Sequence, residues 1–131
     1  MSIKDFAEKF IRAEDEMWKH GNFNALEQIE SPDIVIHMMP PFPDVIGREA
    51  HKAYLQASLV SATDIKQKWQ YLTGDGNVFA LAYESSSRYP KGRPDMGIPA
   101  GATVTANALW VIRIESSKVA EAWLNGSFAV K

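Results

Sequence analysis

The amino-acid sequence predicts an α+β fold in which a cone-shaped, curved antiparallel β-sheet wraps over three N-terminal helices. Two patterns predict this class. The first half of the chain repeats apolar residues every three or four positions, and the second half alternates apolar and polar residues over long stretches. A sheet wrapped in this way leaves a cone with one open end, and such concave spaces are where small ligands bind.

Three segments have the pattern of helices. Residues 3–20 carry an apolar stripe at helical period, and Gly21 suits the left-handed conformation that ends a helix. A shorter helix is expected from residue 24 onward and ends before Pro32, because the residue that precedes a proline disfavours helix. The third helix is expected over residues 48–61.

The remaining segments are predicted strands. Residues 34–38 form the first, and the proline-rich run behind it stops the strand. Alternating segments separated by turn residues then predict an antiparallel meander of long strands, over residues 65–71, 78–89, 103–115 and 118–128. No repeat or composition shift indicates a second domain, so we expect one domain over residues 1–131.

Composition excludes several classes of protein. The chain has 131 residues, which suits a single domain, and its 14 Lys and Arg nearly balance 16 Asp and Glu, so no nucleic-acid partner is expected. The absence of Cys excludes disulfides and thiolate nucleophiles. The three histidines lack the spacing of a metal site and no nucleotide-binding motif occurs, so neither metal nor cofactor is expected. Without a signal sequence or a membrane-length apolar segment, we expect a cytoplasmic protein with no membrane association.

His37 is the first candidate for proton transfer. It lies in the middle of the first predicted strand, and imidazole titrates near neutral pH. It is either a general acid or base that faces a cavity, or a core residue whose ring nitrogens bond to their neighbours.

The last predicted strand places Glu121, Trp123, Asn125 and Ser127 on one face. Because the Trp123 ring needs space, we expect this face to point inward. An inward Glu121 would have a raised proton affinity, which suits proton transfer, whereas at the rim of the cavity it would simply be solvated. Asn125 on the same face could donate hydrogen bonds to a substrate oxygen.

Aromatic residues make up 11% of the chain, and several are candidates for the wall of an apolar pocket. Packing in the core is the alternative for each of them. Glu14, late in the first helix, belongs either to a solvated face or to the mouth of the pocket. The predicted pocket residues are Glu14, Trp18, Tyr54, Trp69, Tyr71, Tyr83, Trp110, Trp123 and Ser127.

Four segments form a series along the chain. They are Asp33-x-Val35-x-His37, Gly47-Arg48-Glu49-Ala50, residues 98–104, and Arg113-Ile114 followed by residues 118–123. Together they resemble the SnoaL-like branch of the nuclear transport factor 2-like superfamily. The resemblance implies a cone-shaped α+β barrel with a deep apolar pocket for a hydrophobic small molecule, usually assembled as a homodimer through the sheet.

The resemblance also implies a chemistry. Polyketide cyclases of this family close a ring by an intramolecular aldol reaction, through acid–base chemistry without a cofactor. Their Asp acid/base lies four residues beyond the Trp of the last strand, where this chain has Ser127, and His37 falls on the family's first-strand histidine. In the related ketosteroid isomerases the catalytic positions fall near Glu14, near His37 or Met38, and near Trp110, and the isomerase residue types are absent here.

Two functions of different classes remain open. In the first, a small enzyme transfers a proton next to a carbonyl, in a cyclisation, isomerisation or dehydration of a hydrophobic polyketide-like or ring compound. His37 would be its acid or base, Glu121 would assist, and Asn125 would bind the developing oxyanion. In the second, a non-catalytic protein of the same fold holds a hydrophobic ligand or acts as a dimeric scaffold. The first requires His37 and Glu121 to face one cavity.

The long strands also predict a homodimer. Their outward residues Thr103, Thr105, Leu109 and Val111 form a face that is too apolar to be fully solvated. A sheet-to-sheet interface between two copies would cover it.

Overall fold

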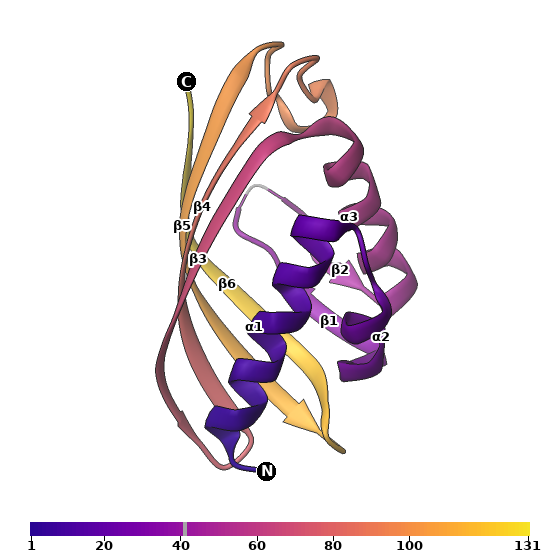
Figure 1. Cartoon of the computed structure of the whole chain (residues 1–131), viewed down its shortest axis with the longest axis vertical. Helices are drawn as coiled ribbons and strands as arrows, with labels where there is room; N and C mark the ends of the chain where they lie inside the picture. The colour runs from indigo at the N-terminus through magenta and orange to yellow at the C-terminus, as the bar shows by residue number, and fades with distance from the viewer. Residues whose placement is uncertain (41) are drawn as a thin grey trace.

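A curved sheet wraps around a layer of helices in this computed structural model, which describes residues 1–40 and 42–131 (Figure 1). The predicted α+β class, with helices preceding a meander of long strands, is confirmed. No helix among the described residues is long and apolar enough to cross a membrane. In chain order the elements are α1 (Ile3–His20), α2 (Asn24–Ile29), β1 (Glu30–His37), β2 (Val45–Ile46), α3 (Arg48–Ser61), β3 (Thr63–Asp75), β4 (Val78–Tyr89), the 3₁₀ helix η1 (Pro94–Met96), β5 (Ala102–Glu115) and β6 (Lys118–Val130).

Within the described residues, six strands form one open sheet in the order β2-β1-β6-β5-β4-β3. All neighbouring strands are antiparallel except β1 and β6, which run parallel. The expectation of a purely antiparallel sheet is therefore wrong at this pair. A long stretch of chain separates the two strands, and only such a crossover lets neighbours run parallel. Pro41, part of the predicted proline-rich run, lies outside the described residues.

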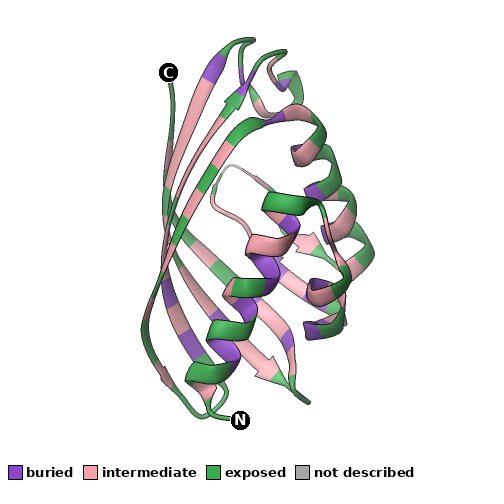
Figure 2. Cartoon of the chain, in the orientation of Figure 1, coloured by how far each residue is buried: buried purple, intermediate pink, exposed green. Residues whose placement is uncertain are grey.

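Helix α1 has clear signals at both ends and one buried face. The Ser2 hydroxyl accepts from the Asp5 amide at 3.1 Å, and the Asp5 carboxylate accepts from the Ser2 amide at 3.3 Å. Gly21 ends the helix in the left-handed region, with φ 65°. The face turned to the sheet is buried and consists of Phe6, Ala7, Phe10, Ala13, Glu14 and Met17 (Figure 2). One carboxyl group therefore lies in an otherwise apolar face.

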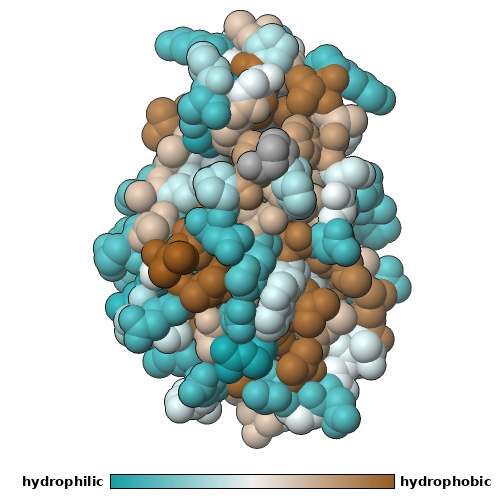
Figure 3. All heavy atoms as spheres, turned by 180° about the vertical axis from the view of Figure 1, so that it is seen from behind, coloured by the Kyte–Doolittle hydropathy of each residue, from teal (hydrophilic) through white to brown (hydrophobic). Residues whose placement is uncertain are grey.

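Two apolar clusters pack the helices and the β4–β5 connection against the sheet. The larger joins α1, α2 and α3 to the sheet, and its largest members include Phe10, Met17, Phe79 and Ile112. The smaller lies where β4 joins β5 and consists of Ala62, Tyr89, Ile98 and Ala102. At the surface seen in Figure 3, hydrophobic side chains gather in separate patches between hydrophilic ones.

Gly126 marks a close approach between β5 and β6. A Cβ atom at this position would overlap the backbone oxygen of Asn107 and lie 2.6 Å from Ala108 Cα. Both are backbone atoms of the paired strand, so no side-chain rotation relieves the contact. We expect Gly126→Ala to lower the free energy of unfolding by about 2–3 kcal/mol, a usual cost of overpacking, as measured by urea denaturation.

The control is Ser127→Ala, the exposed neighbour on the same strand. It should change the free energy of unfolding by less than about 0.5 kcal/mol. A Gly126→Ala variant as stable as wild type would contradict the close approach of the two strands.

Candidate functional site

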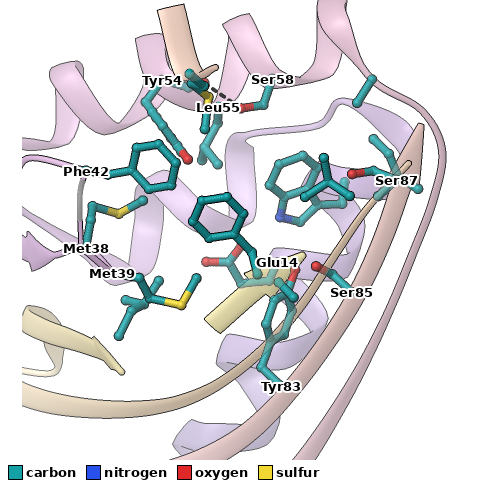
Figure 4. A pocket seen from close by; sticks show the side chains of 18 of the residues that line it. Glu14, Met38, Met39, Phe42, Tyr54, Leu55, Ser58, Tyr83, Ser85 and Ser87 are labelled. Carbon is teal, nitrogen blue, oxygen red and sulfur yellow. Dashed lines mark hydrogen bonds between the residues drawn. The ribbon is translucent and has the colours of Figure 1, made fainter. Parts of the chain in front are cut away.

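A cavity of about 160 Å³ lies between the concave face of the sheet and the helices (Figure 4). Its lining is mostly aromatic and aliphatic. In Figure 4, Met38, Met39 and Phe42 lie on one side of it, and Ser85 and Ser87 of β4 lie on the other. The space therefore suits a small, largely apolar molecule.

Six of the predicted pocket residues line this cavity: Glu14, Trp18, Tyr54, Trp69, Tyr83 and Trp110. Tyr71 shares the inward face of β3 but packs against the larger apolar cluster, away from the cavity. Trp123 and Ser127 do not line it either. Their absence follows from which face of β6 points inward.

The prediction that Glu121, Trp123, Asn125 and Ser127 face inward was wrong. Ala122 is buried, and Leu124 and Phe128 line the cavity, so the opposite face of β6 points inward. Trp123 is 37% exposed, and its ring stacks on that of His37 on the outer face, with 5.5 Å between ring centroids. Since side chains alternate along a strand, an error of one residue moves the whole set to the other face.

His37 lies on that outer face, where both of its ring nitrogens have partners. Nε2 is 2.6 Å from Glu121 Oε2, and Nδ1 is 3.0 Å from Asp44 Oδ2. The hydrogen bond with Glu121 raises the pKa of His37, and the same bond lowers the pKa of Glu121. Arg113 also donates to Glu121, at 3.3 Å. His37, Glu121 and Asn125 therefore do not form a catalytic set in the cavity.

Glu14 is the carboxyl group that the cavity contains. It projects from α1 among Tyr54, Tyr83 and the methionines in Figure 4, and it is only 2% exposed. Of the two alternatives for Glu14, the pocket is therefore the one that the structure supports, and the solvated face is excluded. Burial raises its pKa from 4.5 to about 7, nearby His51 lowers it, and nearby Glu30 raises it. Near neutral pH this carboxyl is present in both its acidic and its basic form.

His51 and Glu30 form a buried ion pair beside the cavity. His51, on α3, lines the cavity, and its Nδ1 lies 2.8 Å from Glu30 Oε2. Burial opposes the charged ring, but the contacts with Glu30 and Glu14 outweigh it and raise the pKa of His51. Sequence reasoning missed this residue, although His51, Leu55 and Ser58 recur at helical spacing on the buried face of α3.

The cavity also holds hydrogen-bond donors. The Tyr83 hydroxyl donates to Gln67 Oε1 at 2.8 Å, and burial raises the pKa of Tyr83 and of Tyr54, which keeps both phenols protonated. The buried indole nitrogens of Trp69 and Trp110 have no partner among the described residues. Among residues 1–40 and 42–131, no group of three or more acidic or histidine side chains is placed to hold a metal ion.

The burial of Glu14 predicts that the protein loses stability as the pH rises. An unfolded carboxyl ionises near its ordinary pKa of 4.5, whereas the folded one ionises near 7. The folded state holds the extra proton between these values, so the free energy of unfolding falls through this window and stays lower above it. A rise of this size corresponds to roughly 3 kcal/mol. We expect Glu14→Gln to gain about 3 kcal/mol on wild type between pH 4 and pH 8, by urea denaturation.

Glu8→Gln is the matched control, since Glu8 lies on the exposed side of the same helix. The difference in free energy of unfolding between Glu8→Gln and wild type should stay the same between pH 4 and pH 8. If Glu14→Gln and Glu8→Gln had the same free energy of unfolding at pH 4 and at pH 8, the prediction that ionisation of Glu14 destabilises the folded state would be wrong.

Comparison with known proteins agrees with this fold. The model of the SnoaL-like domain family matches residues 8–122. A solved structure of a candidate SnoaL-like polyketide cyclase from Jannaschia sp. CCS1 has a TM-score of 0.76 and 14% identity, covering 100% of this chain and 90% of that one. The epoxide hydrolase/cyclase-like enzyme SalBIII, described for its role in pyran ring formation in the polyether salinomycin, has a TM-score of 0.74 and 15% identity, covering 98% and 97%.

A third structure, a candidate SnoaL-like polyketide cyclase from Mesorhizobium loti, has a TM-score of 0.70 and 19% identity, covering 95% of this chain and 98% of that one. At such identities, these structures show the fold alone. A comparison with curated protein sequences found no match. Because the family model spans most of the chain, from residue 8 to residue 122, this protein belongs to the SnoaL-like domain family.

Proposed function

We propose that this protein is a small-molecule enzyme that transfers a proton next to a carbonyl group without a cofactor, with Glu14 as its acid–base group. The observation that carries the proposal is the Glu14 carboxyl, buried in an apolar cavity that can hold a small molecule. Because burial raises its pKa to about 7, it can accept and return a proton near neutral pH.

The proposal moves the acid–base role from His37 to Glu14. His37 and Glu121 bond to each other on the outer face, so neither can contact a substrate in the cavity. The reaction class expected from the sequence is retained. It is a cyclisation, isomerisation or dehydration of a hydrophobic ring or polyketide-like compound.

One proton cycle at Glu14 accounts for this chemistry. The ionised carboxylate takes a proton from the carbon next to the carbonyl, and the electron pair of that C–H bond moves to the carbonyl oxygen, forming an enolate. Tyr54 lines the same cavity, and its protonated phenol is a donor for the enolate oxygen. One such donor contributes on the order of 3 kcal/mol to stabilising the oxyanion. In an isomerisation, Glu14 then returns the proton to a different carbon of the enolate system. In a cyclisation, the enolate carbon attacks a second carbonyl of the same molecule, and Glu14 gives the proton to the oxygen of that carbonyl. In a dehydration, Glu14 gives the proton to the hydroxyl group on the neighbouring carbon, which leaves as water while the C=C bond forms.

The alternative is a non-catalytic protein that holds a hydrophobic ligand in the same cavity. Two observations favour it. His37 and Glu121, which the sequence-based enzyme hypothesis requires to face one cavity, lie on the outer face of the sheet. Ser127, which stands where the resemblance places the cyclase's Asp, does not line the cavity. Ligand binding alone requires no proton transfer, so an exchange experiment separates the two functions.

Deuterium exchange tests the proposal without a known substrate. Three aromatic methyl ketones of increasing size are incubated with the protein in D₂O: acetophenone with one ring, 2-acetylnaphthalene with two and 2-acetylanthracene with three. NMR follows the replacement of their methyl protons by deuterium. We expect wild type to accelerate the exchange of at least one ketone, and Glu14→Gln to reduce that acceleration by roughly 100-fold or more. The rate should rise with pH and level off above about 7, since the ionised carboxylate is the base.

Two further variants complete the test. Glu8→Gln changes an exposed carboxyl on α1 and should leave the rate unchanged. If Glu121→Gln lost the exchange activity and Glu14→Gln kept it, the acid–base group would lie on the outer face of the sheet, which would contradict the proposal. Binding of the ketones by wild type without exchange would support the non-catalytic alternative instead.

We also propose that two copies form a homodimer through the outer face of the sheet. Leu109 of β5 and Trp123 of β6 are 40% and 37% exposed on this face. Thr103, Thr105 and Val111 share it, because they alternate in step with Leu109 along β5. The helices of the described residues all lie on the other side of the sheet (Figure 1). A second copy would remove them from water.

Analytical ultracentrifugation at micromolar concentration tests the dimer. Wild type should sediment as a dimer and Leu109→Glu as a monomer, because each copy would place an unpaired carboxylate in the interface. Val60→Glu is the control: Val60 is 89% exposed on α3, in the helix layer, and its substitution should leave the dimer intact. A monomeric wild type, or a dimeric Leu109→Glu, would exclude this interface.

A further inference from the structure

The size of the cavity limits the molecules that it can hold. Its volume of about 160 Å³ is close to the roughly 150 Å³ of an apolar protein cavity that binds benzene. Pockets for larger ligands usually measure about 300–1,000 Å³. The aromatic walls also resist expansion, since Trp69, Tyr83 and Trp110 pack against one another with centroid distances of 4.3, 5.3 and 5.8 Å.

The charges around the cavity limit its ligands further. Among the described residues that line it, His51 is the one basic side chain, and Glu30 already pairs with it. Arg93 lies near the C-terminal end of α3, and its guanidinium donates to Asp95 at 2.7 Å and to Ser58 at 3.2 Å. An anionic ligand would therefore meet no uncommitted cation among these residues.

The carboxyl groups act against an anion more strongly as the pH rises. Glu14 of α1 lines the cavity and ionises near pH 7, with Asp15 beside it on α1, Glu30 on β1 and His51 on α3. The other titratable side chains of the lining are the phenols of Tyr54 on α3, Tyr83 on β4 and Tyr89 at the end of β4. Burial raises the pKa of Tyr54 and of Tyr83, so these two phenols stay protonated and neutral.

From these limits we propose that the cavity selects an uncharged compound of about one six-membered ring that carries a carbonyl group. The carbonyl rests on the proposed function, whereas the size and the lack of charge rest on the cavity alone. The inference narrows the expected substrates from polyketide-like or ring compounds in general to neutral monocyclic ones.

Calorimetric titration of the whole protein tests size and charge separately. The probes for size are acetophenone, 2-acetylnaphthalene and 2-acetylanthracene, and the probe for charge is benzoate, which has nearly the shape of acetophenone but is an anion. Apolar burial alone would make the larger ketones bind more tightly. We expect the reverse order, with acetophenone binding at least about tenfold more tightly than 2-acetylanthracene and than benzoate at pH 6.

Raising the pH to 8.5 adds a second readout. The affinity for acetophenone at pH 8.5 should stay within about threefold of its value at pH 6, whereas the affinity for benzoate should fall further because Glu14 ionises. Glu14→Gln should abolish this additional loss of affinity for benzoate.

Two alanine variants test the size of the cavity. Ala106→Leu places a larger side chain in the cavity and should lower the affinity for acetophenone at least about tenfold. Ala57→Leu lies on the exposed side of α3 and should leave this affinity unchanged.

The outcomes separate this inference from the proposed function. Tighter binding of 2-acetylanthracene, or benzoate within tenfold of acetophenone, would overturn the inference even if Glu14 still catalyses exchange. Selective binding of acetophenone without exchange would support the inference and leave the proposed function contradicted. Because the ligand series uses wild type, the result does not depend on any variant folding.

Discussion

The packing of Phe10 against the concave face of the sheet is the contact on which the site depends. Its ring centroid lies 5.7 Å from that of Trp69, 6.0 Å from Phe79 and 5.9 Å from Trp110. These contacts hold α1 across β3, β4 and β5, and two of the partner rings also form the wall of the cavity. Glu14 follows Phe10 by one helical turn and shares its face. The contact that anchors the helix therefore also carries a carboxyl group into an apolar space.

The neighbouring charges make that placement tolerable. With Glu30 ionised, His51 protonated and Glu14 neutral, the three buried groups carry no net charge, which a low-dielectric interior favours. Ionisation of Glu14 gives the cluster a net negative charge, and this is why burial and Glu30 raise its pKa while His51 holds the rise in check. A group poised in this way near neutral pH is typical of functional sites.

The outer face of the sheet holds a different set of charges. His37, Glu121, Arg113 and Asp44 form a partly exposed network beside Trp123. Exposed ion pairs of this kind contribute little to stability individually, because water and salt screen them. His37 belongs to the first-strand segment that resembles the SnoaL-like family, yet it lies on the side of the sheet opposite the cavity. The first-strand segment that contains His37 is therefore a marker of the fold, whereas the buried carboxyl of Glu14 marks the candidate site.

The sequence by itself determined the helices, the long strands and most of the cavity wall, because caps, turn residues and apolar periodicity are local signals. Trp69, Tyr83 and Trp110 could be assigned in this way. The sequence alone could not determine which face of β6 points inward. Both alternating sets contain large apolar residues, and the choice depends on pairing with β1 and β5. Nor could it bring together Glu14, Glu30 and His51, which lie on three elements. Only the tertiary structure decided both points, since burial and proximity arise when α1 and α3 pack against the sheet.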